Sequence, residues 1–151
     1  MIDPHLAFSV AGMIAMAGWL GLLVSLFVAR VRPIAWTASQ LAIPALLAVA
    51  YILLIWTGMR ETTGGGFGSI EEVRALFAND SALAAGWLHY LAFDLFVGTW
   101  IAREGLASGV WAVLLIPCLA LTFLFGPAGL LLFLALRLAF RRNSRPVEKV
   151  Q

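Results

Sequence analysis

Four long apolar runs alternate with short polar segments along the chain. Three of them carry no charged residue, and the fourth is interrupted only by His89 and Asp94. A helix that crosses a bilayer needs about 20 predominantly apolar residues, and each run is long enough to supply one. We therefore expect an all-α fold, a bundle of four transmembrane helices. The expected spans are residues 6–29, 34–59, 82–102 and 109–137.

The long polar connection between the second and third spans has helical character of its own. Ser69 followed by Glu72 fits a capping box, in which the two side chains satisfy free N–H groups at the start of a helix. The apolar residues that follow recur at helical spacing: Ile70, Val73, Leu76 and Phe77. This pattern predicts a short amphipathic helix on the membrane surface, with an irregular loop as the alternative.

The last apolar run is about half as long again as one span requires. Pro117 and the pair Gly126-Pro127 lie within it, and both interrupt regular helix geometry. The run could form one bent helix or two segments with a re-entrant break. We expect one kinked span.

Two features of the first two spans predict how they pack. Ala11, Ala15 and Gly18 recur at three- and four-residue spacing, which gives a face of small residues that another helix can approach closely. Pro44 lies inside the second span and predicts a local distortion, because proline has no N–H to donate.

Composition supports a membrane protein. Hydrophobic residues make up 62% of the chain and charged residues 12%, with a mean hydropathy of +0.96, whereas soluble domains average about 25% charged. We expect a single integral membrane domain over residues 1–151, ending in a basic tail at 138–151. Membrane lipid is then an expected partner, and nucleic acid is not.

Topology follows from the arginines and lysines between the spans. Four spans place both termini on one side, and the better count makes that side cytoplasmic, although the turn with Arg30 and Arg32 argues for the opposite. The first run is too long for the core of a signal peptide, so we expect it to be retained as a helix. The chain has a basic tail and no recognisable transit peptide. We therefore expect a bacterial inner-membrane protein.

His89 and Asp94 are the candidates for chemistry. A carboxylate at the centre of a bilayer costs about 2.5–3.5 kcal/mol, so it persists only where it is paired, neutral or in use. On a regular helix Tyr90 and Asp94 share one face, and a second face lies about 140° away. That second face carries His89, Phe93, Phe96 and Trp100.

The inventory of side chains excludes several kinds of chemistry. The two histidines, His5 and His89, lie at different depths, so neither a di-iron centre nor a bis-histidine haem is expected. Lys149 is the only lysine and lies in the tail, which excludes a retinal Schiff base. We expect no metal and no cofactor. Proton transfer remains, with Asp94 and His89 as candidate catalytic residues.

Tyr90, Phe93, Phe96 and Trp100 are the candidate substrate-binding residues. A purely structural reading stays open: Asp94 could bond to a neighbouring backbone, and the aromatic stripe could serve packing alone.

Two segments carry a family resemblance. WLHYLAFDLFVGTWI (87–101) and LFGPAGLLLF (124–133) resemble the abscisic-acid-deficient, neoxanthin-synthase-like family of small four-helix membrane proteins. The spacing of His89, Asp94, Leu95 and Phe96 is its most specific part. Plant members of this family are implicated in the isomerisation of the epoxycarotenoid violaxanthin to neoxanthin, a reaction that opens an epoxide and releases a proton. The resemblance implies a related reaction for this chain.

The leading hypothesis is therefore a membrane-embedded isomerase that acts on a carotenoid or another isoprenoid by acid/base chemistry. One alternative is a non-catalytic protein that binds pigment or lipid and assists another membrane enzyme. A second is a subunit of a proton-coupled transporter, which would require a homo-oligomer or another membrane partner.

Overall fold

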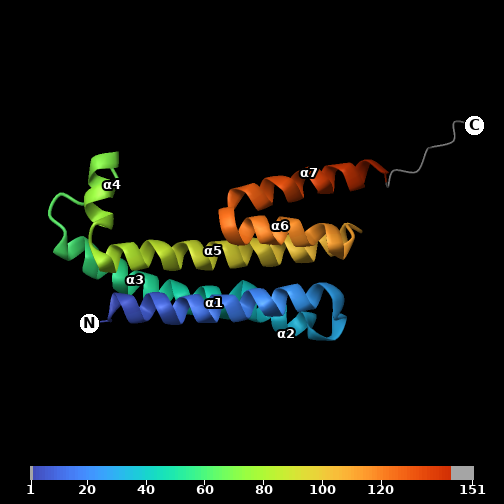
Figure 1. The fold of residues 1–151 in the computed structure, drawn as a ribbon, viewed down its shortest axis with the longest axis horizontal. Helices are drawn as coiled ribbons and strands as arrows, with labels where there is room; N and C mark the ends of the chain where they lie inside the picture. Colours follow the sequence, from blue (N-terminus) through green and yellow to red (C-terminus); the bar gives the residue numbers. More distant parts are fainter. Residues whose placement is uncertain (1, 144–151) are drawn as a thin grey trace, which may run out of the picture.

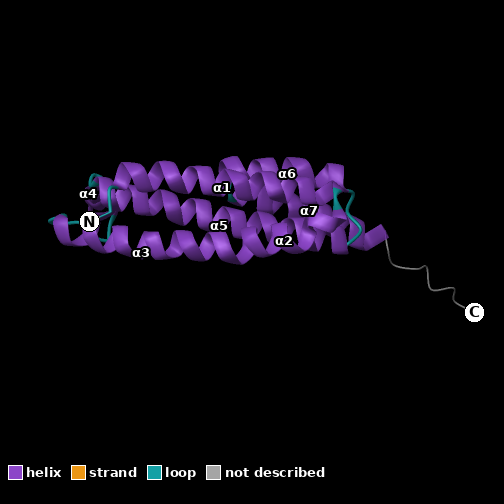
Figure 2. Ribbon diagram, turned by 90° about the horizontal axis from the view of Figure 1, so that it is seen from below, coloured by secondary structure: helices purple, strands orange, loops and turns teal. Residues whose placement is uncertain are grey.

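The computed structural model describes residues 2–143, which form helices joined by short connections and include no strand. Three helical segments are long and apolar enough to cross a membrane: α1 (Pro4–Phe27), the segment Ala29–Glu61, and α5 (Asp80–Ala107). They lie along one common axis, with most of the connections at the two ends (Figures 1 and 2). The first three expected spans are therefore confirmed as helices.

The second segment is continuous but not uniform. It consists of η1 (Ala29–Val31), α2 (Arg32–Thr37), a π-helical turn η2 (Ala38–Ala42) and α3 (Ile43–Glu61). The π turn ends just before Pro44, where proline cannot supply the usual backbone donor. Within the turn, the Ser39 hydroxyl donates to the Gly18 carbonyl of α1 at 3.0 Å. The distortion expected at Pro44 thus takes the form of a wider turn bonded to a neighbouring helix.

α5 is the central helix, because α1, α3, α4, α6 and α7 all pack against it. The small-residue face predicted on α1 is confirmed, since Ala11, Ala15 and Gly18 are all buried. A Cβ on Gly18 would lie 2.8 Å from a methyl group of Leu95 in α5. The missing side chain therefore lets the two helices approach closely.

The last apolar run differs from the expectation of one kinked span. It forms two helices, α6 (Ala112–Phe125) and α7 (Pro127–Asn143), that fold back on each other (Figure 1). Gly126 has a φ of +44°, which ends α6, and Pro127 occupies the first position of α7, where its fixed φ suits a helix start. The fourth helix of the expected bundle is thus a helical hairpin.

This hairpin places the two ends of the described chain at opposite ends of the molecule. α7 runs parallel to α5, with Trp100 against Phe133 and Glu104 paired with Arg137. The start of α1 lies instead beside the start of α5. The described residues thus contain three candidate spans and a hairpin where four spans were expected, and the expectation that both termini share a side is not supported. Residues 138–143 belong to α7, and the rest of the expected tail, 144–151, lies outside the described residues.

The predicted helix between the second and third spans is confirmed as α4 (Ile70–Phe77). The Ser69 hydroxyl accepts the Glu72 N–H at 3.2 Å, and the Glu72 carboxylate accepts the Gly68 N–H at 2.9 Å. The reciprocal capping therefore reaches one residue further back than a standard capping box. Phe77, at the end of α4, rests against Gly86 of α5.

Candidate functional site

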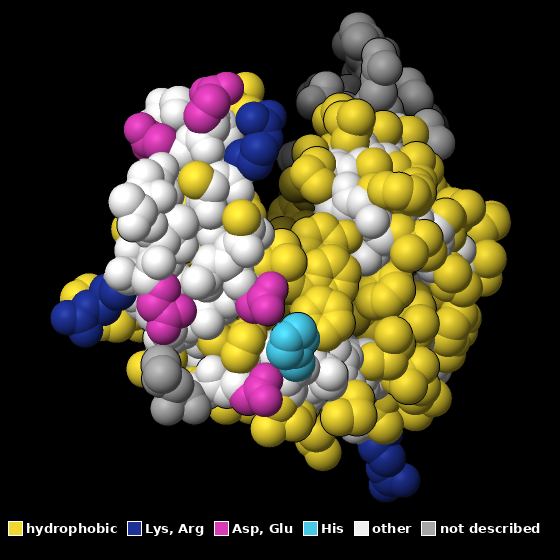
Figure 3. All heavy atoms as spheres, turned by 60° about the vertical axis from the view of Figure 1, so that its left-hand side comes forward, with side chains coloured by type: hydrophobic (Ala, Val, Ile, Leu, Met, Phe, Trp, Pro, Cys, Tyr) yellow, Lys and Arg dark blue, Asp and Glu magenta, His cyan; other side chains and the backbone are white. Residues whose placement is uncertain are grey.

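A groove lies on the N-terminal half of α5, because the α6–α7 hairpin packs against the other half. The groove has a volume of about 520 Å³ and runs from the start of α1 and the end of α4 to Tyr90. Its principal lining residues are His5, Phe8, Phe77, Asp80, Trp87 and Tyr90. Figure 3 shows this end of the molecule, where acidic side chains gather beside an extensive apolar surface.

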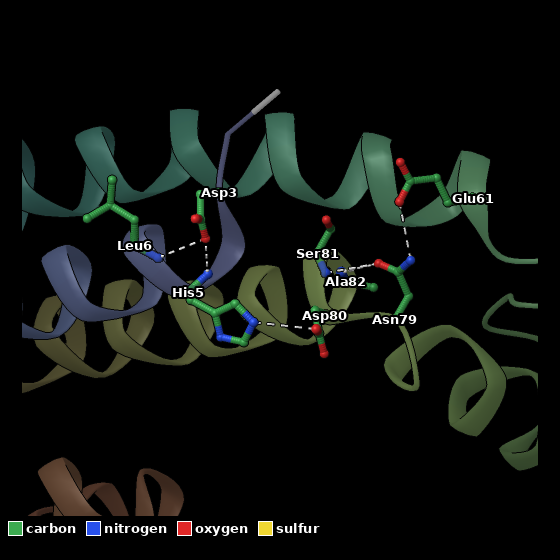
Figure 4. A network of polar contacts seen from close by, with 8 residues as sticks. All are labelled: Asp3, His5, Leu6, Glu61, Asn79, Asp80, Ser81 and Ala82. Atoms are coloured by element: carbon green, nitrogen blue, oxygen red, sulfur yellow. Dashed lines mark hydrogen bonds and ion pairs between the residues drawn. The ribbon is translucent and has the colours of Figure 1, made fainter.

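The outer mouth of the groove is polar. His5 Nε2 lies 3.6 Å from an Asp80 carboxylate oxygen, and both side chains are exposed (Figure 4). Asp3 and Asn79 cap the two helices that meet here: the Asp3 carboxylate accepts the N–H of His5 at 2.8 Å, and the Asn79 side chain accepts that of Ser81 at 2.9 Å. The two caps fix the starts of α1 and α5 on either side of the mouth.

The body of the groove is aromatic. The Trp87 ring stacks on Phe8 of α1 at 5.4 Å and on Tyr90 at 5.3 Å. At the inner end, the Tyr90 hydroxyl donates to the Phe123 carbonyl of α6 at 3.1 Å. This bond connects α5 to the hairpin near the hairpin's tip. The groove is therefore apolar along its length and polar at its two ends.

Asp94 lies one turn beyond Tyr90, beneath the hairpin tip. A Cβ on Gly126 would lie only 2.9 Å from Asp94 Oδ1, so the glycine leaves the room that the carboxyl group occupies. Asp94 Oδ2 is buried and has no hydrogen-bond partner among the described residues. Three groups act on it: the Tyr90 hydroxyl and the His89 ring lie within interaction range, and the start of α7 presents the positive end of a helix dipole.

His89 lies on the neighbouring face of α5 and is exposed. Its ring stacks on Phe93 at 4.5 Å and lies 5.7 Å from the Tyr51 ring of α3. Phe93 and Phe96 are exposed as well, while Trp100 packs edge-on against Phe133 of α7. The structure therefore brings Tyr90 and Asp94 together and keeps His89, Phe93 and Phe96 on a second face, as the helical pattern predicts.

Sequence reasoning missed part of the groove. Trp87 precedes Tyr90 by three residues and Asp94 by seven, so the helical repeat places it on their face and could have identified it. Phe8 and Phe77 come from other helices, and only tertiary packing brings them to Trp87 and Gly86. Gly126 lies in the second segment that carries the family resemblance, which is the one sequence signal that pointed to it.

Within residues 2–143, no three His, Cys, Asp or Glu side chains lie close enough together to hold a metal ion. The groove instead suits an elongated apolar molecule whose inner end reaches Tyr90, with the carboxyl of Asp94 one turn further along α5. A carboxyl group in such a place can give a proton to a bound oxygen or take one from carbon.

Comparison with known families gives one match. The family model described as ABA DEFICIENT 4-like covers residues 6–133, a stretch that contains both Asp94 and Gly126. Neither the curated proteins nor the solved structures gave a match.

Proposed function

The chain belongs to the ABA DEFICIENT 4-like family, and we propose that it is a membrane-embedded isomerase that acts on a carotenoid or a related isoprenoid. Asp94 carries this proposal. Its buried carboxylate oxygen has no partner among the described residues, and it lies one turn beyond Tyr90, the residue that lines the inner end of the aromatic groove. An unpaired acidic group is costly to keep in an apolar bundle. A role in proton transfer would explain why the bundle contains such a group.

The groove favours an isoprenoid as the substrate class. Its wall is formed mainly by apolar and aromatic side chains, which suit a hydrocarbon chain. Polar groups occur at its two ends: His5 and Asp80 at the mouth, and Tyr90, which interacts with Asp94, at the inner end. A long apolar chain with an oxygen-bearing end group matches this distribution.

The proposed reaction moves protons without any oxidant or reductant. Asp94, in its acid form, gives a proton to the oxygen of an epoxide, and the C–O bond breaks. The carbon next to the broken C–O bond then loses a proton to the Asp94 carboxylate, and the electrons of that C–H bond form the new double bond. Substrate and product have the same atoms, and Asp94 returns to its acid form. Tyr90 closes the inner end of the groove next to Asp94. His89, Phe93 and Phe96 lie on the other face of α5 and take no part in this step.

A non-catalytic pigment- or lipid-binding protein is the second candidate. The exposure of His89 and Phe93 on a face beside the groove favours it, because an apolar ligand could cover that face without any reaction. In that case, the start of α7 next to the Asp94 carboxyl would serve only to stabilise its charge.

Isoprenoid extraction separates the two candidates. Cells that contain the protein are expected to convert one isoprenoid into an isomer of equal mass, and cells without it are expected to accumulate the precursor. An Asp80→Asn variant is the matched control, since it removes a carboxylate at the mouth of the groove and not at the reacting end. Identical profiles with and without the protein would refute the isomerase, and pigment bound unchanged to the purified protein would then establish the binding role.

We also infer the orientation in the membrane from the arginines at the two ends of the helices. One end carries Arg30, Arg32, Arg103 and Arg137, and the other carries Arg60 and Arg74. Because basic residues are retained on the cytoplasmic side, the end with four arginines faces the cytoplasm. The start of α1 and the mouth of the groove then lie on the opposite side.

A further inference from the structure

A second cavity lies at the arginine-rich end of the molecule, between the segment Arg32–Ala42 and the end of α5. Its volume is about 570 Å³, and we call it the basic pocket. Six of its lining residues carry the argument: Arg32, Trp36, Gln40, Trp100, Arg103 and Glu104. Trp100, expected from the sequence to bind substrate, lines this pocket instead of the groove, and the two cavities share no lining residue.

Two guanidinium groups of the basic pocket have no carboxylate partner among the described residues. Arg32 donates to the Ser25 carbonyl at 3.0 Å and the Leu26 carbonyl at 3.2 Å, which leaves three of its five N–H groups without a partner there. Within residues 2–143, Arg103 donates only to the Gln40 side chain. The one carboxylate in the lining, Glu104, is already paired with Arg137. The pocket therefore carries unbalanced positive charge.

The two arginines are held in place by the same aromatic ring. The guanidinium carbon of Arg32 lies 5.9 Å from the centre of the Trp36 ring, and that of Arg103 lies 5.5 Å from it. Stacking of this kind orients the planar guanidinium groups and leaves their edges available to an anion. The chain thus presents two ordered fork-shaped donors, which is the geometry that binds phosphate oxygens.

The position of the basic pocket favours a lipid phosphate as the anion. The pocket lies at the ends of membrane-spanning helices, where Trp36 and Trp100 are half-buried as interfacial tryptophans are. Leu106 and Ala107 add apolar surface beside the charges. In the orientation inferred above, this end meets the cytoplasmic leaflet, whose anionic lipids are bound by basic pockets between helices.

We propose that the basic pocket binds the phosphate headgroup of an anionic membrane phospholipid, held by Arg32 and Arg103, which both stack on Trp36. The lipid joins the start of α2 to the end of α5 at a place where the described side chains supply no counter-charge. The site is independent of the isomerase proposal, because it lies at the opposite end of α5 from the groove.

The test uses the full-length protein in a neutral detergent, with native mass spectrometry and thermal unfolding as readouts. Three probes are added in turn: phosphatidylglycerol, phosphatidylcholine and inorganic phosphate. We expect phosphatidylglycerol to bind and to raise Tm, phosphatidylcholine to bind more weakly, and millimolar inorganic phosphate to have no effect. Equal effects of the two lipids would refute an anionic-lipid site, and the same rise in Tm from inorganic phosphate would show a site for a soluble anion instead.

Two variants locate the effect. Arg103→Gln is expected to weaken phosphatidylglycerol binding about fivefold, the effect of one basic residue near an anionic surface. Arg60→Gln is the matched control, because Arg60 stacks on Trp56 at 5.3 Å at the other end of the molecule. Equal weakening in both variants would refute the assignment to the basic pocket. If Arg103→Gln does not fold, the comparison of the three probes on the unmodified protein still decides the proposal.

Discussion

Replacing Gly129 with alanine tests the helical hairpin directly. A Cβ at this position of α7 would overlap the Thr122 backbone nitrogen and hydroxyl and the Cys118 carbonyl of α6. Two of the three atoms belong to the backbone, so rotation of a side chain cannot relieve the overlap. Ordinary contact distances of about 3.5 Å would require the two helices to separate by about 1 Å.

Overpacking of this kind costs about 1–3 kcal/mol. Alanine also favours a helix over glycine by about 1 kcal/mol, and that gain must be separated from the cost. Gly12→Ala is the matched control, because Gly12 lies within α1 and a Cβ there would meet nothing within 4 Å. The difference between the two variants then isolates the overlap.

The assay is thermal unfolding of both variants in the same detergent. At about 2–4 °C per kcal/mol for a domain of this size, we expect Gly129→Ala to unfold about 2–12 °C below Gly12→Ala. If the two variants have the same Tm, α6 and α7 do not pack against each other at Gly129, and the hairpin is refuted.

Two further predictions concern the ends of the helices. Thr63→Cys is expected to react with a membrane-impermeant maleimide on intact cells, and Ser108→Cys is expected to react only after permeabilisation. The buried Cys118 should not react in either variant. The reverse pattern would contradict the inferred orientation. Glu104→Gln and Arg137→Gln are each expected to lower the free energy of unfolding by about 1–3 kcal/mol, because each leaves a half-buried charge unpaired. The double variant should cost less than the sum, and strict additivity would show that the ion pair does not form.

Hydrophobic patterning was sufficient to predict the three long helices and α4. Their apolar stretches and the Ser69 cap are properties of local sequence, and the structure has helices at those places. The two faces of α5 were equally predictable, because a regular helix fixes which residues share a face. Asp94 was found in the same way, as the one carboxylate inside an apolar run.

The hairpin could not be predicted from the same pattern. Gly126-Pro127 is compatible with a kink and with a reversal, and the sequence around it is apolar in both cases. Contacts between distant residues stabilise the reversal: Gly129 fits against α6, and Glu104 of α5 pairs with Arg137. The groove depends in turn on how far the hairpin reaches along α5. Its position and the opposite placement of the two chain ends therefore required the structure.

The central claim is that the Asp94 carboxyl transfers a proton to or from an isoprenoid in the groove. Its most direct test is the isoprenoid profile of cells that produce Asp94→Asn, compared with Asp80→Asn at equal amounts of folded protein. Loss of a general acid typically slows a reaction about 10²–10⁴-fold, so we expect Asp94→Asn to abolish the isomer and Asp80→Asn to retain it. A normal amount of isomer from folded Asp94→Asn would contradict the claim.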